Sequence, residues 1–393
     1  MSETPSVSQP TIVVIAYNRP KSLELLLKSL SCCDYDDKNT RIVISIDGGT
    51  NQLNNEVKKV ADDYKWIHGE KIVLKHEKNL GLRAHILKAG DLVNKYGSII
   101  MLEDDLYVSK YFYHYSKHAI QHYSLDERVA GVSLYAQQYN ETAGKIFQPL
   151  ISGKDTYFMQ LASSWGQIWT KQQWSSFIEW YEQNKDISFS ECNTPPNLSS
   201  WPASSWKKYF IRYLIESDKF FVYPYVSLTT NMREKGVHAK SQDNLLQVPL
   251  LKFNKKNYDF DDFKESSVVY DAFHENIRLR DYLKKSLSDE VTIDIYGTKE
   301  NSNTRYVLTT RIMNKKIIKG YSLKMFPQEE NVLCDLYGKD IFLYDTFINE
   351  KFDIDSKINI RFRNLEFYFL RIPLGKKRSL TYLILSLVKK MWN

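Results

Sequence analysis

The chain has 393 residues, of which 43% are hydrophobic and 26% charged, and this composition excludes an intrinsically disordered protein. The length is enough for two domains at roughly 150 residues each. The formal net charge of +7 favours anionic partners, such as nucleotide diphosphates, acidic glycans or phospholipid surfaces. Nucleic acid is less favoured, because no compact run of Lys and Arg interleaved with aromatic residues occurs in the first half of the chain.

The N-terminal segment and the cysteines indicate the compartment. The first ten residues contain no Lys or Arg and no apolar stretch, so they lack the features of a signal peptide. No run in the sequence approaches the roughly 18 apolar residues of a membrane-spanning helix. The cysteines, Cys32, Cys33, Cys192 and Cys334, have no metal-ligand spacing and are few for a secreted disulfide framework. We therefore expect a reduced, cytoplasmic location.

The first hundred residues alternate between short apolar runs and longer amphipathic segments. Buried strands are expected at 11–17, 41–46, 71–75 and 98–102, and helices at 20–30, 56–64 and 82–96. Pro20 suits the first turn of the first helix, whose leucines recur at helical spacing from Leu23 to Leu30. This alternation predicts an α/β fold with a parallel sheet and helices on both faces. In such sheets the ligand binds beyond the carboxyl ends of the strands.

Polar residues follow three of these strands, namely Arg19, Asp47 and the acidic triplet 103–105. Three adjacent carboxylates repel one another, and a divalent cation removes that penalty. Mn²⁺ and Mg²⁺ prefer carboxylate and phosphate oxygens, so the triplet predicts a metal and phosphate site, with a solvated acidic loop as the alternative. Glycine-rich phosphate loops, a GxSxG elbow and an HExxH helix do not occur in the sequence.

These segments carry a resemblance to a known family. IVVIAYNRP (12–20), ISIDGG (44–49), NLGLRAHILKAGD (79–91), IIMLEDDLYVSKYFYHY (99–115) and VAGVSLY (129–135) resemble the donor-binding half of the GT-A glycosyltransferases. The N-acetylglucosaminyltransferase I type and related bacterial family-2-like enzymes are the most similar. The resemblance continues to about residue 250 through SSWGQIWTKQQW (163–174), WPASSWKKYF (201–210) and VYPYVSLTTNMREKGVH (222–238). It implies a Rossmann-like GT-A domain with a mostly parallel central sheet over residues 1–265.

The resemblance also implies a role for individual residues. Asp105 would bind the metal, and Glu103 and Asp104 would contact the ribose and the donor sugar. The remaining donor-binding positions are Asp47 at the uracil ring, Arg19 and His85 beside the nucleotide, His238 at the diphosphate, and Trp165 and Gly166 along the sugar cleft. His85 could equally belong to a helix core and His238 to a surface loop. Trp169 and Trp174 are interpreted as core residues.

The general base is the point at which the sequence departs from the family. An inverting transferase needs a group that takes the proton from the acceptor hydroxyl, and the relatives supply an Asp near the tryptophan that corresponds to Trp206. No carboxylate stands there in this sequence. Glu216 and Asp218, further along the same predicted helix, are alternatives to Glu234, which is slightly favoured because its loop should lie near the cleft.

The chain changes character after about residue 265, and we expect a smaller α+β region over 266–393. Short alternating segments at 291–296, 305–311, 316–325, 332–344 and 358–372 predict a strand-rich structure. The segment 376–391 begins with three basic residues and predicts a terminal amphipathic helix. Such a helix either binds the inner leaflet of the membrane peripherally or packs on its own domain.

The sequence therefore predicts an inverting transferase that moves a sugar, hexosyl or N-acetylhexosaminyl, from a UDP-sugar to a glycan acceptor with Mn²⁺ or Mg²⁺. By family analogy the acceptor is a bacterial surface polysaccharide of the capsule or lipopolysaccharide type, either a glycan or a lipid-linked glycan. A sugar-phosphate nucleotidyltransferase is one alternative, although the first strand lacks the glycine-rich loop that such an enzyme needs. A non-catalytic nucleotide- or glycan-binding protein is another, because the base is missing.

Overall fold

The structure is a computed structural model that describes residues 9–35, 39–189, 194–232, 246–284, 287, 290–299, 304–352, 360–361, 363–370 and 381. Its contacts divide the chain into two units. Unit 1 comprises Met1–Gln137 and Ser152–Ser266, and unit 2 comprises Gln138–Ile151 and Ser267–Asn393. The second unit thus includes a short segment, 138–151, that the sequence analysis places in the first domain.

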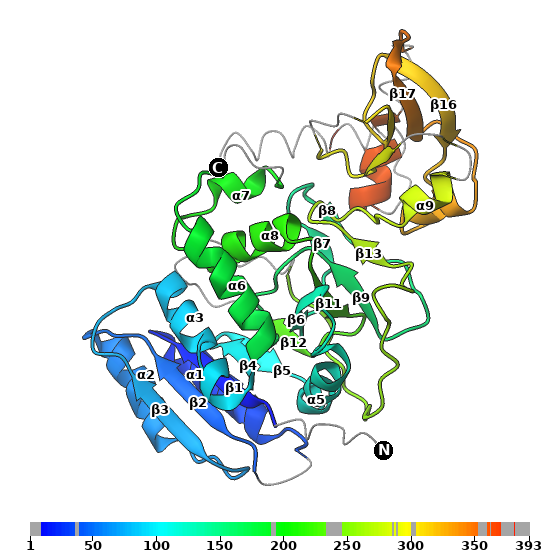
Figure 1. The fold of residues 1–393 in the computed structure, drawn as a ribbon. Helices are drawn as coiled ribbons and strands as arrows, with labels where there is room; N and C mark the ends of the chain where they lie inside the picture. Colours follow the sequence, from blue (N-terminus) through cyan, green and yellow to red (C-terminus); the bar gives the residue numbers. More distant parts are fainter. Residues whose placement is uncertain are drawn as a thin grey trace. The chain divides into compact units, whose positions relative to one another are not determined.

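Unit 1 is built on a mostly parallel sheet whose strands follow the order β9-β11-β6-β10-β4-β1-β2-β3 (Figure 1). The strands are β1 (Thr11–Ala16), β2 (Ile42–Ile46), β3 (Lys71–Lys75), β4 (Ser98–Glu103), β6 (Val129–Ser133), β9 (Thr156–Met159), β10 (Gln167–Thr170) and β11 (Phe220–Pro224). Strands β1 to β4, β6 and β11 run in one direction, and β9 and β10 run against them. The apolar sequences of β1, β2 and β4 fit strands that are buried on both faces, whereas β3 at the edge of the sheet is half-buried.

Helices cover both faces of this sheet. They are α1 (Pro20–Ser31), α2 (Gln52–Asp63), α3 (Leu82–Gly90), α4 (Val93–Tyr96), α5 (Phe112–Tyr123), α6 (Lys171–Asn184), α7 (Asn197–Ser200) and α8 (Trp206–Glu216). Because β2 and β4 lie on opposite sides of β1, right-handed crossovers place α1 and α2 on one face and α3 on the other. In agreement, α1 packs against α2, and α3 and α6 pack against α8 (Figure 1).

Local signals explain where the helices begin and end. Pro20 occupies the first turn of α1, and the predicted leucine stripe of that helix is fully buried. Helix α2 begins four residues earlier than expected, because the Asn51 side chain accepts a hydrogen bond from the Asn54 N–H at 2.8 Å and caps it. The helix expected at 82–96 is divided into α3 and α4 where Trp174 packs against Gly90 and donates to Asp91.

A small ladder follows the acidic triplet directly. Strand β5 (Leu106–Val108) pairs in antiparallel fashion with β12 (Thr229–Asn231). The backbone N–H of Met232 then donates to the backbone oxygen of Asp105 at 2.8 Å. Residues 229–232, which are distant in sequence, therefore lie beside the triplet.

Unit 2 contains a four-stranded sheet in the order β14-β15-β17-β16. Its elements are β7 (Tyr139–Asn140), β8 (Lys145–Ile146), β13 (Val269–Tyr270), α9 (Leu279–Lys284), β14 (Val291–Asp294), β15 (Tyr306–Thr309), β16 (Lys315–Tyr321), α10 (Glu329–Leu333), β17 (Ile341–Asn349) and a π-helix, η1, at Glu366–Leu370. Apolar side chains of β14, β15 and β17 pack with α9 and α10 in its core.

The expected strands of this region are only partly confirmed. Segments 291–296, 305–311 and 316–325 contain β14, β15 and β16, whereas 332–344 begins in helix α10 and enters β17 only at Ile341. The strand expected at 358–372 is wrong, because its described residues are helical; short apolar runs fit either structure. The terminal amphipathic helix expected at 376–391 lies outside the described residues. Within the part of the chain that is described, no helix has the length and apolar character needed to cross a membrane.

Candidate functional site

The carboxyl ends of β1, β2 and β4 lie side by side in unit 1. Ile15 is paired with Glu103 across the parallel strands β1 and β4, and Ala16 is paired with Ile46 across β1 and β2. The backbone N–H of Asp47 donates to Ala16 at 2.9 Å. The residues that follow these strands are thereby brought to one edge of the sheet, as the sequence predicts for Arg19, Asp47 and the triplet.

Arg19 joins the last two acids of the triplet. Its guanidinium forms ion pairs with Asp104 and, at 2.6 Å from Nη1 to Oδ2, with Asp105. The side chains of Asp104 and Asp105 are only 3% and 11% exposed, so the attraction acts in a poorly solvated environment. Burial opposes the charge of Arg19, but the two aspartates outweigh it and raise the pKa of Arg19. Arg19 therefore acts as a built-in counter-ion for this carboxylate pair.

Glu103 remains without such a partner and responds by holding its proton. Burial, and then repulsion from Asp105, raise the pKa of Glu103 to about 8, although Arg19 acts in the opposite direction. Burial also raises the pKa of Asp104 to about 6. At neutral pH the carboxyl of Glu103 is therefore able to donate a hydrogen bond, for example to a sugar or ribose hydroxyl.

Asp47 organises the neighbouring turn through its carboxylate. The carboxylate accepts hydrogen bonds from the backbone N–H groups of Gly48 at 2.8 Å, Leu80 at 2.8 Å and Gly81 at 3.1 Å. The two turns approach so closely that a Cβ on Gly48 would lie 2.2 Å from the carbonyl carbon of Lys78. Gly81 adopts a φ of +77° at the start of α3, a conformation that favours glycine. Asp47 thus fixes the rim of the site, and its contact with a nucleotide base stays a prediction.

His85 is buried behind that rim. Its Nε2 lies 2.8 Å from the Ser45 hydroxyl, and its ring is 5.2 Å from the ring of His76. Burial lowers the pKa of His85 to about 4, despite the opposing effect of Asp47, so its imidazole is neutral at physiological pH. This buried environment agrees with the interpretation of His85 as a helix-core residue. Its ring packs against β2 at Ser45.

Aromatic and basic side chains gather on the other side of the triplet. The Trp165 ring lies 4.7 Å from the ring of Tyr135, and Lys207 Nζ lies 5.4 Å from the Trp165 ring and 5.1 Å from that of Trp201. Lys207 is also within electrostatic reach of Glu103. Trp165 is half-buried and lies just before β10, which runs antiparallel to β4, so it lies at the same edge of the sheet as the triplet. A flat apolar face at this position can pack against a sugar ring.

Gly166 is required by the shape of the loop that holds Trp165. Its φ is +94°, and a Cβ would lie 2.9 Å from Cγ2 of Thr229. The Thr229 hydroxyl in turn donates to the Trp165 carbonyl at 2.5 Å. Gly166 and Thr229 thereby fix the position of Trp165. Trp169 and Trp174 are buried at 0% and 1% exposure, which confirms that they are core residues.

Two of the three candidates for the general base, Glu216 and Asp218, are described by the structure, and neither lies at this edge of the sheet. Glu216 ends helix α8 and is bound by Arg212 at 2.6 Å and by Trp180 at 3.1 Å. Asp218 pairs with Arg128 at 2.9 Å, beside the amino end of β11, which is the edge opposite the triplet. Glu234 and His238 lie outside the described residues.

The acidic triplet offers few ligands for a divalent cation. No group of three or more His, Cys, Asp or Glu able to hold a metal is found in the described part of the chain. Asp105 Oδ1, however, is buried and receives no hydrogen bond. Mg²⁺ and Mn²⁺ commonly take one or two carboxylates together with phosphate oxygens, so this single oxygen suits a metal that arrives with a diphosphate.

Some of the residues that shape the site were not identified from the sequence. Asn54 is fully buried and donates to the backbone oxygens of Tyr17 at 2.7 Å and Asp47 at 3.0 Å, so it ties the ends of β1 and β2 together. A polar residue on the inner face of an amphipathic helix was the available signal. Trp165 was predicted, but the position of Lys207 between Trp165 and Trp201 had no signal, because these tryptophans are 36 positions apart in the sequence.

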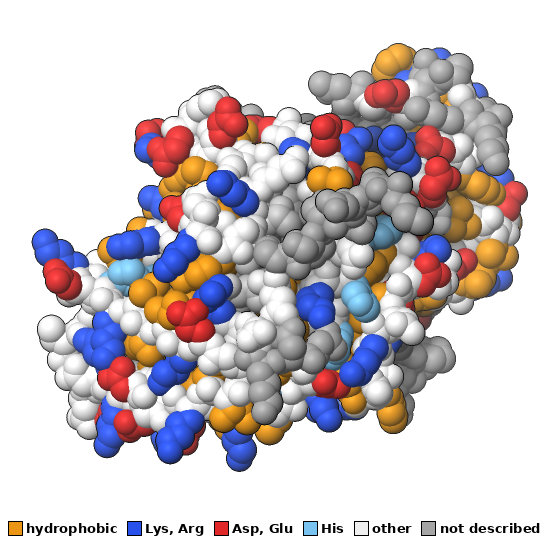
Figure 2. Space-filling view, turned by 60° about the horizontal axis from the view of Figure 1, so that its bottom comes forward, with side chains coloured by type: hydrophobic (Ala, Val, Ile, Leu, Met, Phe, Trp, Pro, Cys, Tyr) orange, Lys and Arg blue, Asp and Glu red, His pale blue; other side chains and the backbone are white. Residues whose placement is uncertain are grey.

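The distribution of Lys and Arg on the surface bears on nucleic-acid binding. Among the side chains drawn in colour in Figure 2, Lys and Arg are scattered singly, with acidic and apolar side chains between them. The side chains drawn in colour therefore form no continuous basic stripe of the kind that follows a nucleic-acid backbone.

No family model matches the sequence, and no curated protein is similar to it. Part of the chain is similar to solved structures at low sequence identity. A mannosyltransferase, PcManGT from Pyrobaculum calidifontis in complex with GDP-Man and Mn²⁺, is 10% identical over 50% of this chain and 52% of that chain, with a TM-score of 0.32. S. aureus TarS 1–349 in complex with UDP-GlcNAc is 14% identical over 58% of this chain and 60% of that chain, with a TM-score of 0.37.

The complex of TarS 1–349 with UDP gives 16% identity, 54% and 60% coverage, and a TM-score of 0.33. The chain spans about half the length of the first of these structures. At these identities, coverages and TM-scores the likenesses are partial, and they do not show what this chain binds or transfers.

Proposed function

We propose that unit 1 is the catalytic part of a metal-assisted glycosyltransferase that transfers a sugar from a UDP-sugar to a glycan acceptor. The observation that carries the proposal is the cluster of Arg19, Asp104 and Asp105 at the carboxyl edge of a mostly parallel sheet. Ligands of open α/β sheets bind at this edge. An arginine and buried carboxylates there suit a nucleotide diphosphate and its cation.

Each residue of the cluster would have a distinct task. Asp105 would hold the cation through its buried, unbonded oxygen, and Arg19 would contact the diphosphate. A bound cation would neutralise the charge that develops on the leaving UDP. The Glu103 carboxyl, which keeps its proton, would donate to a hydroxyl of the donor, and Trp165 would pack against the sugar ring. Asp47 would keep the base-side rim in place and accept from the uracil.

The transfer itself needs a base on the acceptor side. The acceptor hydroxyl would attack the anomeric carbon with inversion, UDP would leave, and a carboxylate would take the hydroxyl proton. Glu234 is the candidate, supported by the position of Met232 next to Asp105 two residues earlier in the chain. The acceptor proposed here, a bacterial surface polysaccharide, and the choice between hexosyl and N-acetylhexosaminyl donors rest on the family resemblance.

Two measurements test the proposal. UDP binding is measured by calorimetry with and without Mn²⁺, and UDP release is measured with a panel of UDP-hexoses and UDP-N-acetylhexosamines. We expect Mn²⁺-dependent UDP binding and release of UDP from at least one donor. Asp105→Asn should lower UDP affinity in Mn²⁺ at least tenfold. The matched control, Asp62→Asn on the exposed face of α2, should not change it.

The outcomes separate the alternatives. A protein that binds neither UDP nor any UDP-sugar would sink the proposal. Binding of UDP-sugars without turnover, tested with glycan acceptors present, would identify a non-catalytic binding protein. Release of pyrophosphate from a nucleoside triphosphate and a sugar phosphate would identify a nucleotidyltransferase.

A further inference from the structure

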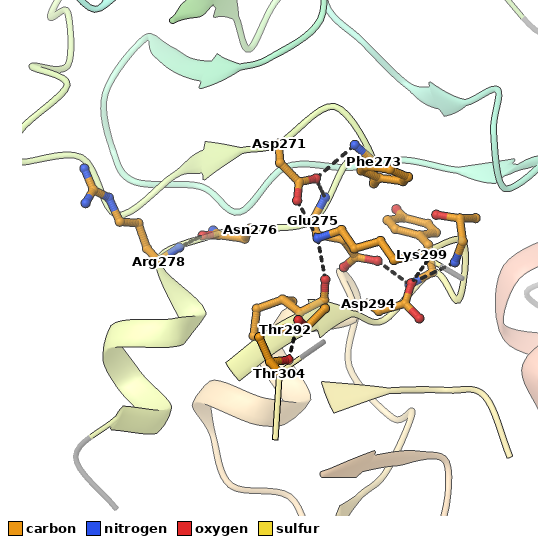
Figure 3. Close-up of polar contacts among 12 residues, drawn as sticks. Asp271, Phe273, Glu275, Asn276, Arg278, Thr292, Asp294, Lys299 and Thr304 are labelled. Carbon is orange, nitrogen blue, oxygen red and sulfur yellow. Dashed lines mark hydrogen bonds and ion pairs between the residues drawn. The ribbon is translucent and has the colours of Figure 1, made fainter. Parts of the chain in front are cut away.

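A second group of buried charges lies in unit 2, which contains none of the residues of the proposed transferase site. Figure 3 shows Asp271, Glu275, Asp294 and Lys299 gathered in one region. Asp294 and Glu275 are 0% exposed. Buried carboxylates are costly unless a cation or several hydrogen-bond donors compensate them. The partners of each carboxylate therefore decide whether the region is complete as it stands.

The two aspartates are fully compensated. Asp271 binds Lys299 Nζ at 2.5 Å and accepts from the backbone N–H groups of Phe273 and Glu275 at 2.9 and 3.0 Å. Asp294 pairs with Arg311 at 2.8 Å and accepts from two further backbone N–H groups. Each aspartate thus has one basic side chain and two backbone donors.

The two glutamates of the region are not compensated in this way. Glu275 Oε1 accepts from the Tyr296 N–H at 2.7 Å, but its Oε2 is buried and receives no hydrogen bond. Glu329 is also 0% exposed, and its Oε2 is equally without a partner. Within the described part of unit 2, neither glutamate forms an ion pair with Lys or Arg. Half of each carboxylate is therefore buried and unsatisfied.

Two more oxygens of the same interior share this condition. The amide oxygen of Gln328 and the hydroxyl of Tyr368 are buried and receive no hydrogen bond, and both residues are 0% exposed. All four side chains are neighbours of Tyr296. Its backbone binds Glu275, its hydroxyl interacts with Gln328, its ring lies 5.9 Å from that of Tyr368, and Glu329 is within electrostatic reach.

We propose that unit 2 binds a divalent cation of the calcium type in its interior, through the free carboxylate oxygens of Glu275 and Glu329, the Gln328 amide oxygen and the Tyr368 hydroxyl. Calcium takes carboxylate, amide and hydroxyl oxygens in flexible geometry, and one ion compensates several acceptors at once. Of the neighbouring bases, Lys299 pairs with Asp271. Lys145 donates to the Tyr296 carbonyl at 3.2 Å, and its Nζ lies 4.3 Å from the Tyr368 ring. The site involves none of the transferase residues, so it stands or falls independently of the proposed function.

A proton on each glutamate is the competing explanation. Each proton adds one donor, but it leaves the carbonyl oxygens of both carboxyls and the two neighbouring oxygens to be satisfied. Burial raises the pKa of Glu275 well above its ordinary value and that of Glu329 to about 8, which favours a proton on each, while Lys299 acts in the opposite direction on Glu275. The two explanations differ in what they predict for added metal, because only the first makes the stability of unit 2 depend on a cation.

The test uses the full chain carrying Asp105→Ala, which removes the metal ligand proposed for the transferase site. Calcium bound after equilibrium dialysis is counted by elemental analysis. Terbium luminescence excited through tyrosine reports the same site, since Tyr296 and Tyr368 would be close to the ion. We expect about one calcium per chain and sensitised terbium emission.

Isosteric variants then locate the ion. Glu275→Gln and Glu329→Gln should each weaken calcium binding at least tenfold, and Tyr368→Phe should weaken it less. Glu330→Gln, the adjacent and partly exposed glutamate of α10, is the matched control and should bind like the parent. Circular dichroism identifies a variant that fails to fold, and Tyr368→Phe, which keeps the ring, then carries the test.

Retention of no calcium, magnesium or terbium by the Asp105→Ala chain would overturn the inference, and so would equal binding by Glu329→Gln. If UDP binding fails in the wild-type chain while calcium is still retained by Asp105→Ala, the proposed function falls and this site remains. The reverse pattern rejects the site and leaves the transferase proposal intact.

Discussion

Replacing Arg19 by Gln removes the counter-ion of the buried aspartate pair while keeping a side chain of similar length. Asp104 and Asp105 would then lie next to each other, 3% and 11% exposed, with no positive charge between them. Removing one partner of a buried ion pair costs about 3–5 kcal/mol. Because the Arg19 side chain is itself 24% exposed, we expect the lower end, about 3 kcal/mol at pH 8.

The loss should depend on pH, and its sign follows from the protonation of Asp104. Burial already raises the pKa of Asp104 to about 6 from 3.8, with Arg19 acting in the opposite direction, so the substitution raises this pKa further. Below pH 4 the aspartates of the folded variant keep their protons, and little is lost. As the pH rises, the unfolded chain releases those protons more readily than the folded one, so the deficit grows up to pH 8.

Urea unfolding of the wild type and Arg19→Gln at pH 5 and pH 8, with a chelator present, measures both quantities. Lys75→Gln is the control, because its ion pair with Asp62 is exposed on both sides and is worth at most about 1 kcal/mol. The reasoning is refuted if Arg19→Gln costs no more than Lys75→Gln at pH 8, or if its deficit is the same at both pH values.

Three further predictions concern the same edge of the sheet. Wild-type stability should fall as pH rises from 4.5 to 8, because folded Glu103 keeps its proton until about 8, and Glu103→Gln should flatten that part of the curve in urea unfolding. Gly48→Ala should weaken UDP binding at least tenfold, since its Cβ would collide with the backbone of Lys78, whereas Gly81→Ala, with open space but a φ of +77°, should cost only about 1–2 kcal/mol of stability. An equal effect of the two on UDP affinity would contradict this. Trp165→Ala should weaken the binding of a UDP-sugar more than that of UDP in calorimetry, by about 1 kcal/mol; an equal loss for both ligands would show that Trp165 does not contact the sugar.

The sheet and the composition of its edge could be predicted because both are encoded locally. Each buried strand is a continuous apolar run, each helix has a regular stripe, and chain direction then decides that Arg19, Asp47 and Glu103 meet. The predicted strand at 358–372 failed for the same local reason, since a short apolar run fits a strand or a buried helix.

Contacts between distant segments could not be predicted from one sequence. The pairing of Arg19 with two acids more than 80 residues away, and the position of Lys207 between Trp165 and Trp201, exist only once the chain is folded. The same is true of Glu275 and Glu329, which are 54 positions apart and belong to no motif in the sequence. Burial, which makes them unusual, is a property of the fold.

The Arg19 ion pairs have a practical consequence for the metal-free protein. Because an internal guanidinium already balances Asp104 and Asp105, unit 1 does not need an ion in order to fold, and a chelator should leave it intact. Any cation that enters must compete with this resident positive charge. The affinity of unit 1 for a cation should therefore be low in the absence of nucleotide. Cation binding should become favourable only when a diphosphate draws Arg19 away from the aspartates, so that the cation and the nucleotide bind together.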